Sequence, residues 1–328
     1  MKYAKDTRPK GVANKAAEVL VEALPWIKNI TGKTVVIKYG GSAMVDEQLR
    51  ADVMNDIVLL KIVGVNPVIV HGGGKAITEA MDFLQLPVEF KDGQRVTTPE
   101  AMDLLRTVLM GKVNQELVEA LNEHGNFAVG VSGADAGVIV AEQASPELGR
   151  VGRITRINRP LLDDLVNAAS IPVVASVALG EDGGFYNVNA DMVAGHIAAA
   201  IGAHKVVFLT DVDGLYENFE NKDSLISNLT LFEAQYMVEN NIVSTGMIPK
   251  LKSCIHALDS GVFRAHIING ITPHSLLLEL LTSTGVGTTM HSTEESCTFD
   301  THPLGNFASK LLENRQHAAS AMPNNKIF

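Results

Sequence analysis

Cysteine is almost missing from this 328-residue chain, which contains only Cys254 and Cys297. No disulfide framework is therefore implied, and a reducing compartment is the expected setting. Long apolar runs are missing as well, because Gly, Asp or His interrupts each run before it reaches the length of a membrane span. The N-terminus has charges but no compact apolar segment ahead of a cleavage site, which argues against secretion. We expect a cytoplasmic protein without a membrane segment.

An excess of positive charge is also lacking. The net charge of −10 argues against nucleic-acid binding, since phosphate backbones select for basic faces. The ten histidines show no metal-ligand spacing, so we expect no structural metal. Hydrophobic residues make up 46% and charged residues 20%, as in an ordinary globular protein. The length allows one large domain or two closely packed lobes.

Strands rich in Val and Ile alternate with helices along most of the chain. The predicted strands are 34–37, 67–71, 171–177 and 205–214, and the clearest predicted helices are 12–24, which Pro25 should end, and 191–202. This alternation predicts an α/β fold with a mostly parallel sheet covered by helices. Segment 84–99 lacks the alternation and predicts a hairpin or lid.

Two glycine loops, Gly40–Gly41 and Gly72–Gly74, each follow a predicted strand and precede a predicted helix. Free backbone N–H groups and the helix dipole make such junctions anion sites, although either loop could simply form a tight turn. Lys38 ends the first strand and would point its ammonium group into the same site. Its alternative is a surface lysine at a strand end.

The two familiar nucleotide motifs are both incomplete. Gly32-Lys33-Thr34 resembles the end of a Walker A loop, but Ile27 stands where the first glycine belongs. Gly72–Gly74 begins a dinucleotide fingerprint, but Ile77 stands in place of its third glycine. We therefore expect neither a P-loop protein nor a nicotinamide-dependent oxidoreductase.

Six segments in a fixed order carry a family resemblance. They are IKYGG (37–41), VIVHGGG (68–74), DGQRVT (92–97), YNVNADMVA (186–194), LTDVDGLYEN (209–218) and STGMIPKL (244–251). Over roughly residues 15–291 they resemble the acetylglutamate kinases of the amino-acid kinase family. The resemblance implies a three-layer αβα sandwich with an N-terminal helix extension. It also implies transfer of the γ-phosphate of ATP to the side-chain carboxylate of N-acetyl-L-glutamate, a step in arginine biosynthesis.

The resemblance implies that Lys38 and Lys250 flank the transferred phosphoryl group and that Asp191 holds both lysines. Physical chemistry agrees, because phosphoryl transfer depends mainly on positioning and on neutralising charge. No general base is needed, since the attacking carboxylate is already ionised at neutral pH. The alternative for Asp191 is an N-cap of helix 192–202.

By the same resemblance, Arg95 would bind the α-carboxylate of the acceptor, and Asn187, Gly73 and Gly74 would complete the acceptor site. The alternatives are an exposed hairpin arginine and a turn asparagine. ATP would contact Gly40, Gly41, Asp211, Gly214, Tyr216 and Gly246, and Mg²⁺ would arrive with ATP rather than in a protein site of its own.

Three residues near these motifs need separate interpretation. We expect His71 to be a packing or hydrogen-bonding residue and Cys254 to lie in the core. Lys75 follows the triple glycine where the family often has proline. It could simply be exposed, or it could tune acceptor affinity.

The arginine-inhibited branch of this family carries a helix before the first strand, as residues 12–24 do here, and that helix joins dimers into a hexamer. By resemblance, inhibitory arginine would lie against His266 or His274, Glu279 and Gly285. The alternative for Glu279 is a solvated helix residue. We expect an arginine-sensitive hexamer built as a trimer of dimers. Whether a regulatory signalling protein docks on it stays open.

These expectations divide the chain into four parts: an N-terminal oligomerisation helix at 1–30, an acceptor-binding lobe at 31–180, a nucleotide-binding lobe at 181–291 and a weakly ordered polar tail at 292–328. Two further functions compete with the kinase reaction above. One is a sister kinase acting on free glutamate or carbamate, and the other is a catalytically silent arginine sensor or scaffold. Arg95 and Asn187 disfavour the first, and the trio Lys38, Asp191 and Lys250 disfavours the second.

Overall fold

The computed structural model describes residues 10–292 except Val45, Asp92, Phe219, Thr245 and Thr284. The polar tail expected at 292–328, with a short helix near 307–315, lies outside the described residues except for Ser292. Among the described helices, none combines the length and the apolar character that a bilayer crossing requires.

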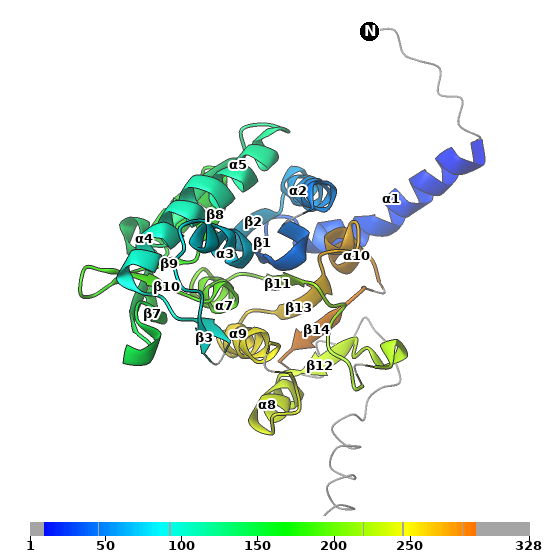
Figure 1. The fold of residues 1–328 in the computed structure, drawn as a ribbon. Helices are drawn as coiled ribbons and strands as arrows, with labels where there is room; N and C mark the ends of the chain where they lie inside the picture. The colour runs from blue at the N-terminus through cyan, green and yellow to red at the C-terminus, as the bar shows by residue number, and fades with distance from the viewer. Residues whose placement is uncertain are drawn as a thin grey trace, which may run out of the picture. The chain divides into compact units, whose positions relative to one another are not determined.

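An eight-stranded sheet forms the centre of the fold, in the order β12-β14-β13-β11-β1-β2-β8-β5 (Figure 1). Its strands are β1 (Thr34–Tyr39), β2 (Asn66–His71), β5 (Ala128–Ser132), β8 (Ile171–Ala175), β11 (Lys205–Thr210), β12 (Asn228–Thr230), β13 (Arg264–Asn269) and β14 (Thr288–His291). Neighbouring strands are parallel except β13 and β14, which are antiparallel. The predicted α/β class with a mostly parallel sheet is confirmed.

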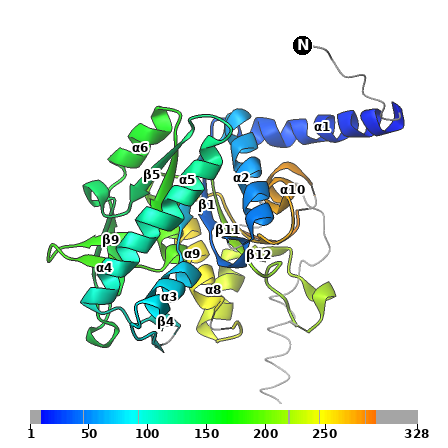
Figure 2. The ribbon, with the colours of Figure 1, turned by 45° about the horizontal axis from the view of Figure 1, so that its top comes forward.

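Helices cover both faces of this sheet. On one face lie α2 (Glu47–Ile62), α5 (Gln115–Asn122) and α10 (Ser275–Leu281), and on the other lie α7 (Ala190–Ala200), α8 (Leu231–Glu239) and α9 (Ile248–Asp259), as Figures 1 and 2 show. The remaining helices are α1 (Lys10–Ile30), α3 (Gly74–Phe83), α4 (Pro99–Val108) and α6 (Pro160–Asn167), with the π-helical turn η2 (Leu109–Asn114) joining α4 to α5. Short 3₁₀ turns are η1 (Gly41–Met44), η3 (Asp135–Gly137), η4 (Pro146–Leu148) and η5 (Lys222–Ser224).

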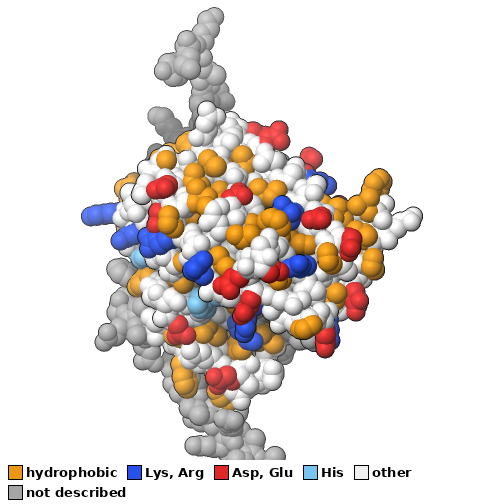
Figure 3. All heavy atoms as spheres, turned by 90° about the vertical axis from the view of Figure 1, so that its left-hand side faces the viewer, with side chains coloured by type: hydrophobic (Ala, Val, Ile, Leu, Met, Phe, Trp, Pro, Cys, Tyr) orange, Lys and Arg blue, Asp and Glu red, His pale blue; other side chains and the backbone are white. Residues whose placement is uncertain are grey.

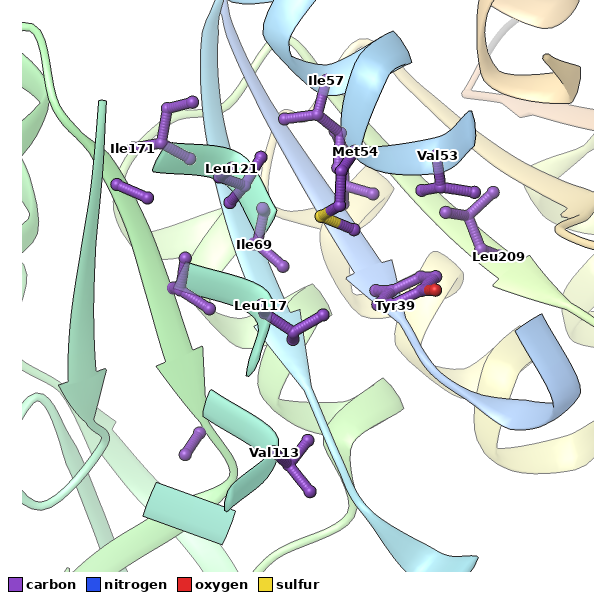
Figure 4. Packing of buried hydrophobic residues seen from close by; sticks show 14 of the residues in the cluster. Tyr39, Val53, Met54, Ile57, Ile69, Val113, Leu117, Leu121, Ile171 and Leu209 are labelled. Atoms are coloured by element: carbon purple, nitrogen blue, oxygen red, sulfur yellow. The ribbon is translucent and has the colours of Figure 1, made fainter. Parts of the chain in front are cut away.

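The main core lies between the sheet and the helices α2 and α5. Tyr39 packs beside Met54 of α2, and Leu117 of α5 lies over the neighbouring strands (Figure 4). Successive side chains of a strand point to opposite faces. Because Tyr39 faces this core, the preceding residue Lys38 faces the α7 side of the sheet. The core therefore fixes the direction of the one charged side chain in β1.

A second sheet and a hairpin stand beside the carboxyl ends of β2 and β8. The sheet has the order β10-β9-β6-β7, with β6 (Ile139–Gln143), β7 (Gly152–Ile157), β9 (Val177–Gly180) and β10 (Phe185–Asn187). The hairpin consists of β3 (Phe90–Lys91) and β4 (Gln94–Arg95). The hairpin expected in segment 84–99 is therefore confirmed.

Three predicted boundaries were wrong. Pro25 lies inside α1, which continues to Ile30. Proline removes one helical hydrogen bond, but Trp26 and Ile27 pack against the core and Ile30 is buried in it, and this packing sustains the last turn. The segment 171–177 is two strands in two different sheets, divided at Ser176. The strand predicted at 205–214 ends at Thr210, where the sheet ends.

The face shown in Figure 3 carries no concentration of one charge. Acidic and basic side chains are interspersed there with hydrophobic ones. On this face, the excess of negative charge does not form an acidic patch.

Candidate active site

Two lysines from distant segments meet on one carboxylate. Nζ of Lys38, in β1, lies 2.9 Å from Oδ1 of Asp191. Nζ of Lys250, in the first turn of α9, donates to Oδ2 of Asp191 at 3.2 Å. Asp191 itself lies in the first turn of α7. The structure thus brings together the three residues expected to be catalytic.

Local chemistry explains how α7 presents Asp191. The N-cap of the helix is Asn189, whose Oδ1 accepts from the backbone N–H groups of Asp191 and Met192. The alternative interpretation of Asp191 as the N-cap was therefore wrong, and its side chain is free to bind the lysines. Ser253 Oγ of α9 donates to the main-chain oxygen of Asp191 at 2.5 Å, which ties the two helices together.

A glycine makes this close packing of α7 and α9 possible. A Cβ at Gly195 would lie 2.3 Å from Oγ and 2.6 Å from the main-chain oxygen of Ser253, too near for any larger residue. The separation of the two helices fixes the position of Lys250 relative to Asp191. Gly195 thereby helps to set the geometry of the charged group.

The cluster carries more positive than negative charge. The side chains of Lys38, Lys250 and Asp191 are 12%, 16% and 8% exposed. Burial raises the pKa of Asp191, but the two ammonium groups outweigh it and hold that pKa below its ordinary value. Asp191 is therefore ionised at neutral pH. Two ammonium groups on one carboxylate give the cluster an excess of positive charge, which suits an anionic ligand.

The two glycine loops border this charge. Lys38 folds back over the first loop, so that its Nζ lies 2.9 Å from where a Cβ would stand at Gly40. In the second loop, Gly73 precedes α3, and a Cβ there would lie 2.6 Å from Leu109 Cδ2. Any larger residue at Gly73 would have to displace the buried side chain of Leu109. Both glycine loops lie next to Lys38, where glycine lets an anion approach the main chain.

His71 and Asn114 hold the second glycine loop in place through hydrogen bonds. Asn114 Nδ2 donates to Nε2 of His71 at 2.9 Å and to the oxygen of Val173 at 2.8 Å. Since Nε2 accepts, Nδ1 carries the proton and donates to the oxygen of Gly72 at 2.9 Å. Burial lowers the pKa of His71 to about 4, so its ring is neutral. The expectation that His71 packs and hydrogen-bonds is confirmed, as is the core position of Cys254.

One cavity of about 240 Å³ unites the residues expected to bind the acceptor. Lys38, Asp191, Gly73, Gly74, Arg95 and Asn187 all line it. A second cavity of about 860 Å³ shares Lys38 and the second glycine loop with the first and is also lined by Gly40 and Gly41. Lys75 is exposed and lines this second cavity. The two cavities thus share Lys38 and the second glycine loop, whereas neither is lined by Lys250 or by the expected nucleotide residues Asp211, Gly214, Tyr216 and Gly246.

Arg95 is nearly buried, so the alternative of an exposed hairpin arginine was wrong. Its Nη2 donates to the oxygen of Gly74 at 3.0 Å and to Oγ1 of Thr78 at 2.7 Å. The guanidinium also stacks over Phe90 of β3, 4.7 Å from the ring centroid. These contacts hold the β3–β4 hairpin against α3, at the mouth of the smaller cavity.

Asn187 ends β10 and reaches the same cavity from the second sheet. Its Nδ2 donates to Oγ1 of Thr97 at 3.2 Å, and its backbone N–H donates to the oxygen of Arg150 at 2.8 Å. Strand pairing with β9 holds its main chain, so the alternative of a turn asparagine was wrong.

The residues expected to bind the nucleotide occupy the carboxyl end of β11 and the start of α9. Asp211 is exposed directly after the strand, Gly214 is buried, and the hydroxyl of Tyr216 donates to Asp213. A Cβ at Gly214 would lie 2.4 Å from Oγ1 of Thr288. Gly246 is exposed just before α9. Open α/β sheets bind ligands at this edge.

The residues expected at the arginine site divide into two groups. His266, Glu279 and Gly285 come together: Nδ1 of His266 lies 2.7 Å from Oε1 of Glu279, and a Cβ at Gly285 would lie 2.8 Å from Oε2. His274 lies elsewhere and contacts Oδ1 of Asp56 in α2 at 2.7 Å. Glu279 is 7% exposed, so the alternative of a solvated helix residue was wrong.

Residues that the motifs did not single out complete these groups. Asn189 and Ser253 hold Asp191, Thr78 and Phe90 hold Arg95, and Thr289 donates to Oε1 of Glu279 at 2.8 Å. Asn189 lies within segment 186–194, where its residue type makes it a possible helix cap, as it does for Asp191. The other residues act through contacts that no local pattern marks.

Several known proteins are similar to this chain in sequence. The model of the amino acid kinase family matches residues 33–269. An acetylglutamate kinase of Caldanaerobacter subterraneus subsp. tengcongensis is 50% identical over 274 residues, which cover 83% of this chain and 92% of that protein. An acetylglutamate kinase of Bifidobacterium adolescentis is 48% identical over 285 residues, covering 84% and 89%.

Among solved structures, N-acetylglutamate synthase from Neisseria gonorrhoeae, complexed with coenzyme A and N-acetyl-glutamate, matches with a TM-score of 0.74. It is 22% identical, and the match covers 95% of this chain and 71% of that one. At this identity the likeness concerns the fold alone.

Proposed function

This chain belongs to the amino acid kinase family, and from that premise we propose that it transfers the γ-phosphoryl group of ATP to the side-chain carboxylate of N-acetyl-L-glutamate. The product is N-acetyl-L-glutamyl 5-phosphate, an intermediate in arginine biosynthesis. The observation that carries the proposal is the pair Lys38 and Lys250 on the single carboxylate of Asp191, beside two glycine loops.

The geometry supports catalysis by charge neutralisation. Lys38 and Lys250 would contact the oxygens of the transferring phosphoryl group, where negative charge redistributes in the transition state. Asp191 holds each ammonium group on a separate carboxylate oxygen, so that both lie beside the proposed position of the phosphoryl group. The acceptor carboxylate is ionised at neutral pH and attacks phosphorus directly, so no side chain need remove a proton.

The smaller of the two cavities suits the acceptor substrate. In the smaller one, Arg95 and Asn187 would bind the α-carboxylate and the acylated amine of the acceptor, with N–H groups of Gly73 and Gly74 beside the reacting end. Gly40 and Gly41 would cradle the phosphates of MgATP, with Asp211, Gly214, Tyr216 and Gly246 around the rest of the nucleotide. The Mg²⁺ belongs to the ATP substrate and neutralises its phosphates. Residues 31–180 then act as the acceptor lobe and 181–291 as the nucleotide lobe.

The first experiment measures ADP release from MgATP with N-acetyl-L-glutamate or free glutamate as the acceptor. We expect turnover that depends on the acetylated acceptor and falls at least ~100-fold in Lys250→Ala. Lys252→Ala is the matched control, because Lys252 is exposed on the same helix two residues away. Turnover with free glutamate or carbamate would indicate a sister kinase. No turnover with any acceptor would favour the sensor or scaffold.

Arginine inhibition is the second part of the proposal. Glu279 is a buried, ionised carboxylate next to His266 and Lys205, and a cationic ligand there would find a counter-charge. We expect millimolar arginine to lower turnover, and Glu279→Gln to weaken that response at least tenfold. An unchanged inhibition curve in this variant would contradict the assignment.

Hexamer formation is the third part. Helix α1 exposes Val19, Leu20, Val21 and Leu24 by 57–68%, an apolar stretch that a second copy of the helix could cover. We expect gel filtration to give a trimer of dimers and the double variant Leu20→Asp/Leu24→Asp to give only dimers. A wild-type dimer that is indifferent to arginine would contradict both regulatory proposals. Within this proposal the enzyme works in the cytoplasm, and docking of a signalling protein on the ring is left to a binding experiment.

A further inference from the structure

Thr97 occupies a junction between the two side chains proposed to bind the acceptor. It is completely buried. Its Oγ1 accepts from Nδ2 of Asn187 at 3.2 Å and donates to the main-chain oxygen of Arg95 at 2.9 Å. Arg95 comes from the β3–β4 hairpin and Asn187 from the second sheet. One hydroxyl thus bridges two elements that are separate in the sequence and in the sheets.

The hydrogen of this hydroxyl decides how the amide of Asn187 is turned. A threonine hydroxyl has one hydrogen, and here it is directed to the oxygen of Arg95. Toward Asn187 the hydroxyl can then only accept, so the amide must present its Nδ2 to Thr97. Its Oδ1 and its second N–H are left for a ligand in the cavity that Asn187 lines. The bridge therefore sets which polar group the acceptor meets.

The backbone around Thr97 is held independently of its hydroxyl. The N–H of Thr97 donates to the oxygen of Leu148 at 3.0 Å, and its oxygen accepts from the N–H of Arg150 at 2.6 Å. The oxygen of Arg150 in turn accepts from the N–H of Asn187 at 2.8 Å. Removing only the hydroxyl should leave this main-chain connection intact. The two hydrogen bonds of the Thr97 hydroxyl are therefore not needed to hold this backbone in place.

We propose that Thr97 is a positioning residue for the acceptor: its hydroxyl locks the Asn187 side chain to the Arg95 main chain, so that both groups meet the N-acetylated amino acid in one fixed geometry. The inference rests on the acceptor roles proposed above for Arg95 and Asn187. Without the hydroxyl, Asn187 loses its fixed amide orientation and the hairpin loses one attachment to the second sheet. Acceptor binding weakens, whereas the lysine cluster and the nucleotide site keep their contacts.

The test compares Thr97→Val, which keeps the shape and removes the hydroxyl, with Thr97→Ser, which keeps the hydroxyl. For Thr97→Val we expect the KM for N-acetyl-L-glutamate to rise roughly tenfold, which corresponds to about 1.4 kcal/mol. The KM for MgATP and kcat should stay within about twofold. Thr97→Ser should resemble the wild type in all three constants. If Thr97→Val does not fold, Thr97→Ala replaces it with the same expected split.

Thr288→Val is the matched control for losing a buried hydroxyl. Thr288 is also fully buried, donates to the oxygen of Ile226 at 2.7 Å and accepts from the N–H of Leu215 at 2.8 Å. We expect it to lower the melting temperature about as much as Thr97→Val does, without changing the KM for the acceptor.

Three results would overturn the inference: an unchanged acceptor KM in Thr97→Val, an equal rise in both KM values, or a Thr97→Ser variant that is as impaired as Thr97→Val. Each requires a wild-type enzyme that turns over N-acetyl-L-glutamate. If the wild type does not, the proposed function has failed instead, and the wild-type assay alone reveals it.

Discussion

Asp191 and Glu279 are both buried carboxylates, but different groups hold them. Asp191 contacts two ammonium groups, from Lys38 and Lys250, whose side chains are still partly exposed. Glu279 receives hydrogen bonds from Thr289 and from the backbone N–H groups of Val286 and Gly287, and from His266. Burial lowers the pKa of His266 to about 4, so this histidine is neutral.

Because different groups contact them, the two buried carboxylates have different effects on the charge of their surroundings. Around Asp191 the contacting groups carry more charge than the carboxylate, and Lys38 and Asp191 line a cavity that an anion can enter. Around Glu279 the contacting groups are neutral at pH 7. Burial raises the pKa of Glu279, but the hydrogen bond and charge of His266, which is protonated where Glu279 titrates, outweigh it together with the hydrogen bonds from Val286 and Thr289. They hold the pKa of Glu279 at about 2, so the negative charge is retained. The first arrangement offers positive charge to a ligand, whereas the second stores negative charge inside the fold.

Removing the charge of Asp191 should have the largest effect. Asp191→Asn keeps the shape of the side chain but removes the counter-charge that Lys38 and Lys250 share. The two ammonium groups then repel each other and are no longer held in place. We expect kcat, measured by ADP release, to fall at least ~100-fold. Asp259→Asn, exposed at the end of α9, is the matched control. A kcat within tenfold of the wild type would remove the contrast with Glu279.

Neutralising Glu279 should lower stability, besides weakening the response to arginine proposed above. Glu279→Gln replaces one accepting oxygen by an NH₂ group, which would face hydrogen-bond donors instead of accepting from them. We expect the free energy of unfolding, from urea titration, to fall by roughly 2–3 kcal/mol. Glu239→Gln, at the exposed end of α8, should change it by less than ~0.5 kcal/mol. Equal effects of the two variants would show that the buried hydrogen bonds contribute little.

Acid should destabilise the fold through its buried neutral histidines. His71 has a pKa of about 4 in the folded protein, below its ordinary value of 6.5, because it is buried. Its contribution is complete above pH 6.5 and is lost as the pH falls toward 4, since the unfolded chain then binds the proton more readily. From pH 7 to 5 we expect a loss of about 2 kcal/mol from this residue.

Urea titrations at pH 5, 6 and 7 would measure that loss, with His71→Gln as the variant that removes the share of His71, while His204 and His266, whose pKa values are also about 4, keep theirs. Glu279 contributes nothing to the slope in this window, because its pKa of about 2 and its ordinary value of 4.5 both lie below it. A slope that is as steep in His71→Gln as in the wild type would contradict the role of His71.

Much of the fold followed from the sequence because its signals are local. Val- and Ile-rich strands followed by glycine predicted β1 and β2, and the alternation along β1 explains why Lys38 and Tyr39 face opposite sides of the sheet. Local signals failed where a long-range contact decided the outcome. Packing of Ile30 carried α1 through Pro25, and a change of sheet at Ser176 divided one apolar run into two strands.

The site shows the same limit. Asn189 and Asp191 cap helices equally well, so the sequence could not decide which of them would cap α7. His274 and Asp56 are 218 positions apart, and Thr97 and Asn187 are 90 apart. No pattern in a single sequence marks such pairs. Thr97 nevertheless stood inside the quoted segment 92–97, where only its hydrogen bonds revealed its connection to Asn187.

The order of the central sheet also governs how the chain can fold while it is being made. Val35 of β1 pairs with Lys205 of β11, which comes roughly 170 residues later in the chain. At about 5–20 residues per second, ribosomes would need roughly 10–30 seconds to supply that partner strand. Throughout this interval β1 presents an unpaired, Val-rich edge to other nascent chains. We expect chaperones to be needed until β11 has emerged, and fragments that end before it to aggregate.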